Sequence, residues 1–325
     1  MKTILVSGAS GIVGYGVLKS LRAANPGLFT LIGTSIYADS IAPAFCDIFE
    51  LAPMTSEEHY IDWLCEIIIK HKVDMIVPGI DADMQAWNTS RSKIAETGVV
   101  ALLNTADLIT LCSDKWLFYE SLESNGSALV IESRLEGDFN QLKESFGMPF
   151  LLKPRRGFAS KGIVIVDSEE CFNEHKVDLG SVVMAQPIVG SNDEEYSVSA
   201  FFDVDSQLRC LMSIRRKLAK EGYTEKAVVE ILAGVEAAIL ELAEYFKPVG
   251  PTNFQFRVHA GQLKILEINP RVSSATSIRT GFGYNESMMS VDYFLNNVLP
   301  SQPKISSGYA IRYVEDHIFY DSSTV

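Results

Sequence analysis

The first third of the chain alternates apolar, strand-like segments with segments of helical periodicity, and this alternation constrains the fold more than any other feature. The segment TILVSG is apolar and β-branched, and the helical pattern VGYGVLKSLRAAN follows it. The same alternation recurs through LFTLIGTSIY, EEHYIDWLCEIIIKHK, VDMIVPGI, ADMQAWNTSRSKIAE and VVALLN. Such an order predicts a parallel sheet with helices on both faces. We expect this α/β unit to span residues 1–112.

The pattern changes after Cys112. Ser113 is a plausible N-cap for a helix in SDKWLFYESLESNG, which Gly126 would terminate. Two segments then read as strand, turn and strand, namely MPFLLKPRRGFASKGIVIVDS and TNFQFRVHAGQLKILEINP. The second turns near Ala260-Gly261. Hairpins in place of strand–helix–strand units predict a different, α+β organisation for residues 113–325.

Composition excludes several classes of protein. The chain has 325 residues and a net charge of −13, which argues against a general nucleic-acid binder because phosphate binding needs a basic surface. No apolar run approaches the roughly 20 residues needed to span a bilayer, and we find no signal peptide. The five cysteines are scattered without a CxxC pair. We therefore expect buried free thiols, a reducing cytoplasmic setting, and no nucleic-acid or membrane partner.

A glycine-rich turn, GASGIVG, lies between the first strand and the first helix. Such a turn can hold a dinucleotide pyrophosphate, in which case an acidic residue should follow the second strand. Ser35 stands near that place, and Asp39 comes only later. A nicotinamide-dependent oxidoreductase therefore stays open as an alternative, beside a scaffold in which the glycines serve packing.

The first hairpin carries a candidate anion site. Lys153 ends a strand, and the loop from Gly157 to Gly162 holds Ser160 and Lys161. Backbone amides in a small polar turn can form an anion-binding concavity, to which the two lysines add charge. No helix follows the loop, so it is not the GxxxxGK[ST] loop. The alternative is a solvated basic hairpin loop.

The second hairpin carries a candidate metal site. Glu267 and Asn269 are two apart, so on a strand they face the same side. A three-residue loop centred on Gly261 would place Gln255 opposite Glu267, whereas a two-residue turn would put Gln255 on the other face. In the first register three oxygen-bearing side chains converge, which suits Mg²⁺ that also binds substrate phosphates. Arg271, just beyond, could stabilise a phosphoryl group. The alternative is a strand end with capping polar residues.

Five segments in one order resemble the ATP-grasp superfamily: SDK, LLKPRRGFASKGI, AQPIVG with EEYSV, NFQFRV and LEINPR. The resemblance covers nearly the whole chain. It is most specific in LEINPRVSSAT, which is similar to a stretch of carbamoyl phosphate synthase large-subunit-like proteins and related carboxylate–amine ligases. It implies a Rossmann-like pre-ATP-grasp domain, 1–112, and a two-subdomain α+β ATP-grasp domain, 113–325, with a lid subdomain at about 125–186.

The resemblance also implies a role for each matching residue. ATP phosphates would be contacted by Lys115 and Lys153, under a loop with Ser160 and Lys161. Adenine would be held by backbone groups of Gln186 to Ile188, and ribose would be bound by Glu195. Mg²⁺ (or Mn²⁺) would be held by Gln255, Glu267 and Asn269, and the γ-phosphate or an acyl phosphate would be contacted by Arg271. Many relatives carry glutamate at Gln186, and many carry an acid at Gln255, although the synthase itself has glutamine there.

The implied activity is ligation of a carboxylate to an amine through an acyl phosphate. The chain has one half's worth of the duplicated synthase, so complete carbamoyl phosphate synthesis by this chain alone is not expected. Arg215, Arg216 or Lys217 is a candidate for the acidic substrate, with Arg215 favoured. Asp81 and Asp83 follow a strand at the carboxyl edge and are candidates for an amine, with helix N-capping as the alternative for Asp81. Arg279 is a candidate for an anionic group, or else a solvated helix residue. A non-catalytic nucleotide-binding protein stays open as a further alternative, and a homodimer is the default assembly.

Overall fold

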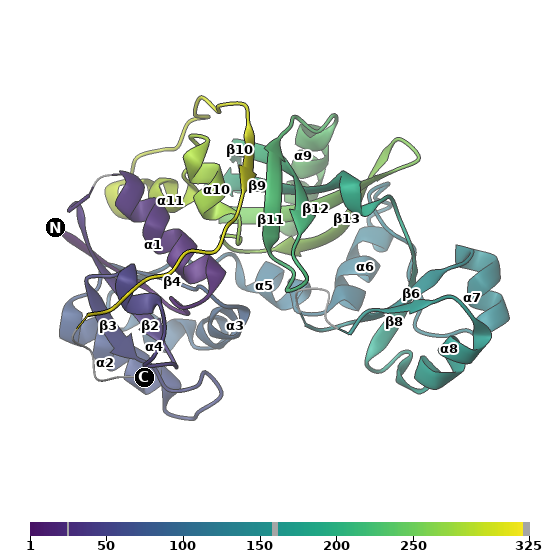
Figure 1. Cartoon of the computed structure of the whole chain (residues 1–325), viewed down its shortest axis with the longest axis horizontal. Helices are drawn as coiled ribbons and strands as arrows, with labels where there is room; N and C mark the ends of the chain where they lie inside the picture. Colours follow the sequence, from purple (N-terminus) through teal and green to yellow (C-terminus); the bar gives the residue numbers. More distant parts are fainter. Residues whose placement is uncertain (25, 158–161, 321–325) are drawn as a thin grey trace.

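The computed structural model describes residues 1–24, 26–157 and 162–320. Figure 1 shows three groups of elements, each built around its own sheet. Among the described residues, no helix is long and apolar enough to cross a membrane. All five cysteines are free, and only Cys210 is buried; the other four are half-buried, so the expectation of buried thiols is wrong for them.

The first group is a five-stranded parallel sheet with helices on both faces, as the alternation predicts. Its order is β3-β2-β1-β4-β5. One hydrophobic cluster forms under α1, and another forms under α2 and α3 on the other face. The elements are β1 (Lys2–Val6), α1 (Ile12–Ala24), β2 (Phe29–Ser35), a 3-10 turn (Ala42–Ala44), β3 (Ile48–Leu51), α2 (Tyr60–His71), β4 (Met75–Val77), α3 (Asp81–Thr89), α4 (Arg91–Ala95) and β5 (Val100–Ala101).

Two short helices lead out of the first sheet. They are α5 (Ala106–Cys112) and α6 (Lys115–Ser124). The N-cap of α6 is Asp114 and not Ser113, because the Asp114 carboxylate accepts a hydrogen bond from the backbone N–H of Trp116 at 2.9 Å. The sequence-based placement of the cap was therefore wrong by one residue.

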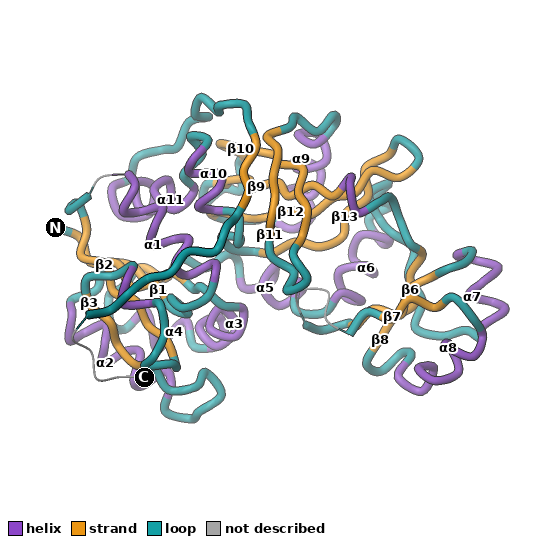
Figure 2. The backbone as a smooth tube through the Cα atoms, viewed as in Figure 1, coloured by secondary structure: helices purple, strands orange, loops and turns teal. Residues whose placement is uncertain are grey.

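The second group is a small antiparallel sheet that projects from the rest of the molecule (Figures 1 and 2). Its order is β7-β6-β8. Phe150, Leu152 and Ala185 form a core of their own with α7 and α8. The elements are α7 (Phe139–Phe146), β6 (Phe150–Pro154), β7 (Val164–Val166), α8 (Glu169–His175), a 3-10 turn (Lys176–Asp178) and β8 (Val183–Pro187).

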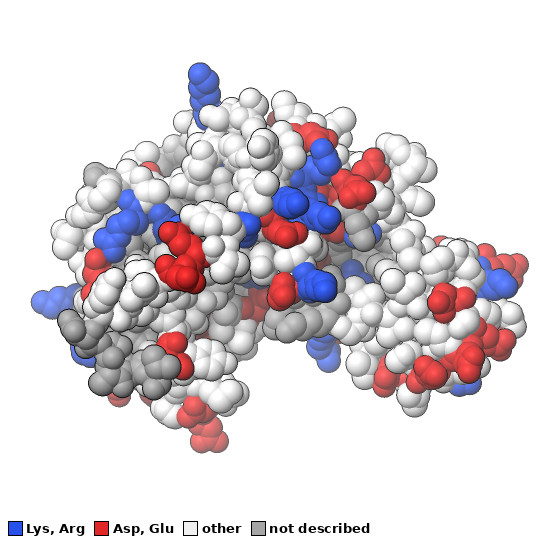
Figure 3. Space-filling model, in the orientation of Figure 1, with Lys and Arg blue, Asp and Glu red and all other residues white. Residues whose placement is uncertain are grey.

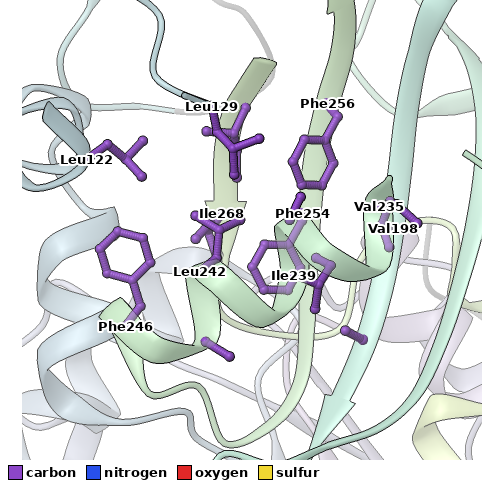
Figure 4. Packing of buried hydrophobic residues seen from close by; sticks show 14 of the residues in the cluster. Leu122, Leu129, Val198, Val235, Ile239, Leu242, Phe246, Phe254, Phe256 and Ile268 are labelled. Carbon is purple, nitrogen blue, oxygen red and sulfur yellow. The ribbon is translucent and has the colours of Figure 1, made fainter. Parts of the chain in front are cut away.

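The third group is a six-stranded antiparallel sheet of order β13-β12-β9-β10-β11-β14. Helix α9 covers one face, where Ile239, Leu242 and Phe246 pack against Phe254 and Phe256 (Figure 4). The other face of the β9–β12–β13 part stays polar. The elements are a 3-10 turn (Asn192–Glu194), β9 (Glu195–Phe202), β10 (Leu208–Leu218), β11 (Thr224–Val229), α9 (Val235–Phe246), β12 (Gly250–His259), β13 (Gln262–Asn269) and β14 (Tyr309–Ile311).

Two helices after β13 return to the first group. They are α10 (Thr276–Gly281) and α11 (Glu286–Asn296). Val272 and Val291 belong to the same buried cluster as Ile4 and Val17 of the first sheet unit. The chain therefore closes its C-terminal half onto α1, and this places the end of β13 beside the carboxyl edge of the parallel sheet.

Candidate active site

A cavity of about 530 Å³ lies where the three groups of elements meet. Its walls come from β6 and β8, from the polar face of β9, β12 and β13, and from the carboxyl edge of the parallel sheet. The volume falls in the range of small-molecule and cofactor sites. Figure 3 shows Lys and Arg gathered near the middle of the visible face, while Asp and Glu dominate the projecting group.

The second hairpin brings its polar side chains together by a route that the sequence did not predict. His259 pairs with Gln262, so the turn is the two-residue Ala260-Gly261 turn. Gln255 nevertheless pairs with Glu267, because the register shifts between Gln255 and Phe256 and leaves Leu266 as an extra residue on β13. A β-bulge of this kind re-aims the side chains that follow it. The convergence of Gln255 on Glu267 is therefore real, but a bulge and not a three-residue loop produces it.

The proposed metal ligands line one end of the cavity. Gln255, Glu267 and Asn269 all face it, and the Asn269 amide donates to Glu267 Oε1 at 3.2 Å. Among the described residues, no group of three or more His, Cys, Asp and Glu side chains could hold a metal ion. The trio has a single carboxylate. Its oxygen donors therefore fit Mg²⁺ that takes its remaining ligands from water and phosphate.

Lys153 is the buried cation of the site. It ends β6, it is 9% exposed, and it lines the cavity. Burial lowers the pKa of Lys153 to about 8, although the nearby Glu267 carboxylate acts in the opposite direction. Lys115 lies beside it and donates from Nζ to the carbonyl of Gly157 at 2.8 Å. Ser160 and Lys161, the other expected contacts of this loop, lie outside the described residues.

The segment between β8 and β9 forms the wall next to Lys153. Gln186 is buried and lines the cavity, and its Nε2 donates to Ser133 Oγ at 3.0 Å. Pro187 and Val189 also line the cavity, whereas Ile188 between them is half-buried and does not. The residues that line the cavity here therefore offer backbone groups, as the resemblance implies, and the Gln186 side chain already donates to Ser133.

Glu195 lies in a cluster of two arginines that the sequence did not predict. It is 5% exposed and accepts hydrogen bonds from Arg216 Nη2 and Arg257 Nη2, both at 2.8 Å. Burial acts to raise the pKa of Glu195, but the two guanidinium groups outweigh it, so the pKa is lowered. Arg216 also donates to Gln255 Oε1 at 2.6 Å. Strand alternation in NFQFRV places Arg257 on the same face as Gln255. This alternation could have predicted from the sequence that Arg257 belongs to the site.

Comparisons with known proteins support the resemblance and the fold. Residues 184–317 match the sequence model of a family described as ATP-grasp in the biosynthetic pathway with Ter operon. The chain has the ATP-grasp fold. The resemblance carried by the five sequence segments is thereby confirmed.

Solved structures with the same ATP-grasp fold align over most of the chain. The N5-carboxyaminoimidazole synthetase of Staphylococcus aureus, complexed with ADP, covers 94% of this chain and 80% of its own, with a TM-score of 0.74 and 18% identity. The biotin carboxylase domain of the Hydrogenobacter thermophilus 2-oxoglutarate carboxylase, solved with MgADP, ADP and bicarbonate, covers 95% and 73%, with a TM-score of 0.71 and 15% identity.

Curated relatives are larger than this ATP-grasp chain. The carbamoyl phosphate synthase large chain of Methanosarcina mazei is 25% identical over 270 residues, which are 73% of this chain and 25% of the relative. That of Methanothrix thermoacetophila is 24% identical over 257 residues, 70% of this chain and 23% of the relative. The chain thus spans about a quarter of the length of these relatives.

The basic residues of β10 divide between the two faces of the ATP-grasp sheet. Arg216 lines the cavity, whereas Arg215 pairs with Glu230 at 2.8 Å on the other face, where Tyr196 also binds Glu230. Lys217 is exposed and lies outside the cavity. The preference for Arg215 as the substrate residue was wrong, because neighbouring residues of a strand point to opposite faces.

Arg271 reaches the cavity but is bound to the first unit. Its Nε and Nη2 donate to the two carboxylate oxygens of Asp81 at 2.7 and 3.0 Å. Asp83, the other acid after β4, is 4% exposed and accepts from Thr55 and Tyr60. Asp83 does not line the cavity, so the structure does not support it as a contact of an amine substrate.

Arg279 is neither a solvated helix residue nor a direct anion ligand. It is fully buried, where it pairs with Glu286 at 3.1 Å and donates to Asn253 Oδ1 at 2.8 Å and Ser273 Oγ at 2.7 Å. Asn253 and Ser273 line the cavity. Arg279 therefore supports the wall of the site from behind.

The glycine-rich turn of the first unit serves close packing. A Cβ at Gly14 would lie 2.3 Å from Gly8 O, and a Cβ at Gly79 would lie 2.1 Å from Ser7 O and 2.9 Å from the Cα of Gly14. Ser35, at the place of the expected acid, pairs its hydroxyl with Ser10 at 2.9 Å. The oxidoreductase alternative is not supported, because a serine and not an acid ends β2 beside this turn.

Proposed function

We propose that this chain activates a carboxylate with ATP and joins it to an amine or a related nucleophile. One observation carries the proposal: a single cavity holds buried Lys153 on one side and Glu267, Asn269 and Arg271 on the other. Phosphoryl transfer needs cations placed around the terminal phosphates more than it needs a protein nucleophile. The arrangement supplies these cations and no covalent chemistry.

The proposed reaction has two steps. A carboxylate oxygen attacks the γ-phosphorus of ATP, and the bond from that phosphorus to the β–γ bridging oxygen breaks, so ADP leaves and an acyl phosphate forms. An amine nitrogen then attacks the acyl carbon, phosphate leaves with the electrons of the C–O bond, and the amine proton passes to solvent. Lys153, Lys115 and Arg271 would hold phosphate oxygens, and the cavity walls would restrict water.

We assign the metal and nucleotide contacts in the same way. Mg²⁺ bound by Glu267 and Asn269, with Gln255 beside them, would neutralise charge on the phosphates. Backbone groups of Gln186 to Ile188 would hold adenine. Glu195 would reach ribose only with an oxygen that also serves an arginine, so its role is as much to fix Arg216 and Arg257. Arg216 replaces Arg215 as the candidate for an anionic substrate. Ser160 and Lys161 stay predictions.

The relatives support the class of reaction. They include a carbamoyl phosphate synthase large chain, a synthetase complexed with ADP, and a biotin carboxylase domain with MgADP, ADP and bicarbonate. We carry over ATP and Mg²⁺ as ligands, a small carboxylate and an amine as substrates, and the division into residues 1–112 and 113–325 with a lid at about 125–186. A homodimer and a cytoplasmic setting stay predictions.

A thermal-shift titration tests the nucleotide class. Only a ligand that binds the native state raises the midpoint, by mass action. We expect ATP with Mg²⁺ to raise it and NAD(H) to leave it unchanged. A shift with NAD(H) and none with ATP would reject the proposal.

A turnover screen separates an enzyme from a non-catalytic nucleotide-binding protein. Amino acids and small carboxylates are paired with amines, and ADP and phosphate release are measured together. We expect equal amounts of both products for the true pair. Strong ATP binding with no release above that of the Lys153→Met variant, for any pair, would favour the non-catalytic alternative.

A further inference from the structure

A bidentate ion pair joins the parallel-sheet unit to the phosphate end of the cavity. Asp81 is the first residue of α3, and Arg271 follows β13, 190 residues later in the sequence. Both side chains line the cavity. The Arg271 side chain is 13% exposed and that of Asp81 is 32% exposed. Two units that come from opposite ends of the chain thus meet at one guanidinium.

The contacts fix the plane of the guanidinium. Nε and Nη2 bind the two Asp81 oxygens, while Nη1 donates to the carbonyl of Val272 at 3.0 Å. Fork-to-fork pairing of an arginine with a carboxylate sets orientation as well as distance. Three of the five N–H groups are thereby committed. Nη2 also donates to Oδ1 of Asn269, one of the proposed metal ligands, at 3.5 Å, which leaves one N–H on Nη1.

Asp81 is itself firmly placed. Two residues later in the first turn of α3, buried Asp83 accepts hydrogen bonds from Thr55 and Tyr60, which ties this turn to α2 and the loop before it. Burial acts to raise the pKa of Asp81, but Arg271 and, less strongly, Lys115 outweigh it, so the pKa is lowered and the carboxylate stays charged. Asp81 therefore offers Arg271 a rigid anionic partner.

We infer that Asp81 is a positioning residue that sets the orientation of Arg271 toward the terminal phosphate of ATP. This inference rests on the proposed function. It replaces the expectation that Asp81 holds an amine, since each of its oxygens already accepts a hydrogen bond from Arg271. It also gives the parallel-sheet unit a part in phosphate recognition, through a carboxylate whose two oxygens bind the arginine.

Charge-conserving variants test the inference. Asp81→Glu keeps the charge and moves the carboxylate by one methylene, and Arg271→Lys keeps the charge and removes the fork. Affinities for ADP with Mg²⁺ and for a β,γ-imido ATP analogue with Mg²⁺ are measured by calorimetry. The affinity for the analogue divided by the affinity for ADP is the ratio that reports binding of the terminal phosphate. We expect each single variant to lower the ratio about tenfold while ADP affinity stays within about twofold.

The double variant decides whether Asp81 acts through Arg271. We expect Asp81→Glu to cause no further loss in the Arg271→Lys background, because residues that act as one unit are not additive. Asp107→Glu, an exposed acid in the first turn of α5, is the matched control and should leave the ratio unchanged. An unchanged ratio in Asp81→Glu, or an equal loss in both backgrounds, would overturn the inference.

Two further outcomes are separable. If neither nucleotide binds the parent chain, the proposed function fails and not this inference alone. If Asp81→Glu does not fold, Asp81→Asn goes through the same cycle, since it conserves size and removes one of the two acceptors. The same loss is expected with Arg271 present and none in the Arg271→Lys background, and any other result counts against the inference.

Discussion

The Lys153 ammonium loses its proton within a pH range that experiments can reach, because burial lowers its pKa. Its pKa of about 8, below the ordinary value of 10.5, means that the ammonium is lost from the free protein as the pH rises past that point. Phosphate oxygens bind the charged form. We expect ATP–Mg²⁺ affinity to fall about fivefold between pH 8 and pH 9, as measured by calorimetry.

The Lys153→Arg variant is the control for this prediction, because a guanidinium stays charged over the same range. A fall of the same size in this variant would contradict the assignment. The free energy of unfolding should change in the opposite direction to the ATP affinity. Between pH 8 and 10.5 the unfolded chain binds more protons at this lysine than the folded chain, so the free energy of unfolding without nucleotide rises with pH.

At the residue scale the sequence predicted which side chains line the cavity better than it predicted their partners. Lys153, Glu267 and Asn269 follow from strand ends and from period-two alternation. The engagement of Glu195 by Arg216 and Arg257 does not follow, because it depends on the pairing of β9 with both β10 and β12. Sequence order alone gives neither pairing. The prediction that Arg215 contacts the substrate has the same weakness, because a shift of one residue along the strand decides which face of the sheet a side chain is on.

At the element scale the hairpin β12–β13 shows how two local features combine. The turn residues Ala260 and Gly261 have φ values of 50° and 77°, which glycine adopts easily and alanine does not. A two-residue turn alone would put Leu266 opposite Gln255, and the bulge corrects this. A turn is readable from its residues, whereas a bulge at an ordinary leucine has no local signal.

The turn gives a prediction at this scale. Ala260 is exposed and holds a left-handed conformation, and the Asn-Gly pair suits a hairpin turn with both φ values positive. We expect Ala260→Asn to raise the free energy of unfolding by about 0.5–1 kcal/mol, measured in urea. Asn269 lies at the opposite end of β13 from the turn, so the affinity for nucleotide should stay unchanged. An equal or lower stability would contradict the turn assignment.

At the scale of the whole molecule, the sequence predicted two regions but not how tightly they interlock. Helices α10 and α11 lie late in the sequence, yet they pack on α1, and Thr280 Oγ1 donates to Ser20 Oγ at 2.9 Å. Asn104, after the parallel sheet, donates to Thr252 of β12 at 2.8 Å. Amphipathic patterns show that a helix has a buried face, but they do not say which distant element covers it.

This interlocking predicts a single cooperative unfolding transition, although chains of this length often show more than one. Gly16 of α1 is the sensitive point, because a Cβ there would lie 3.1 Å from the Thr276 methyl carbon of α10.

In a Trp116→Phe background, fluorescence reports Trp63 and Trp87 of the first unit, and circular dichroism reports the whole chain. We expect the two urea transitions to coincide and Gly16→Val to lower both midpoints equally. Gly281→Val, at a site with no atom within 4 Å of the added Cβ, should shift them less. If Gly16→Val separated the fluorescence transition from the dichroism transition, the two regions would be independent, and the Asp81–Arg271 pair would join bodies that can move apart.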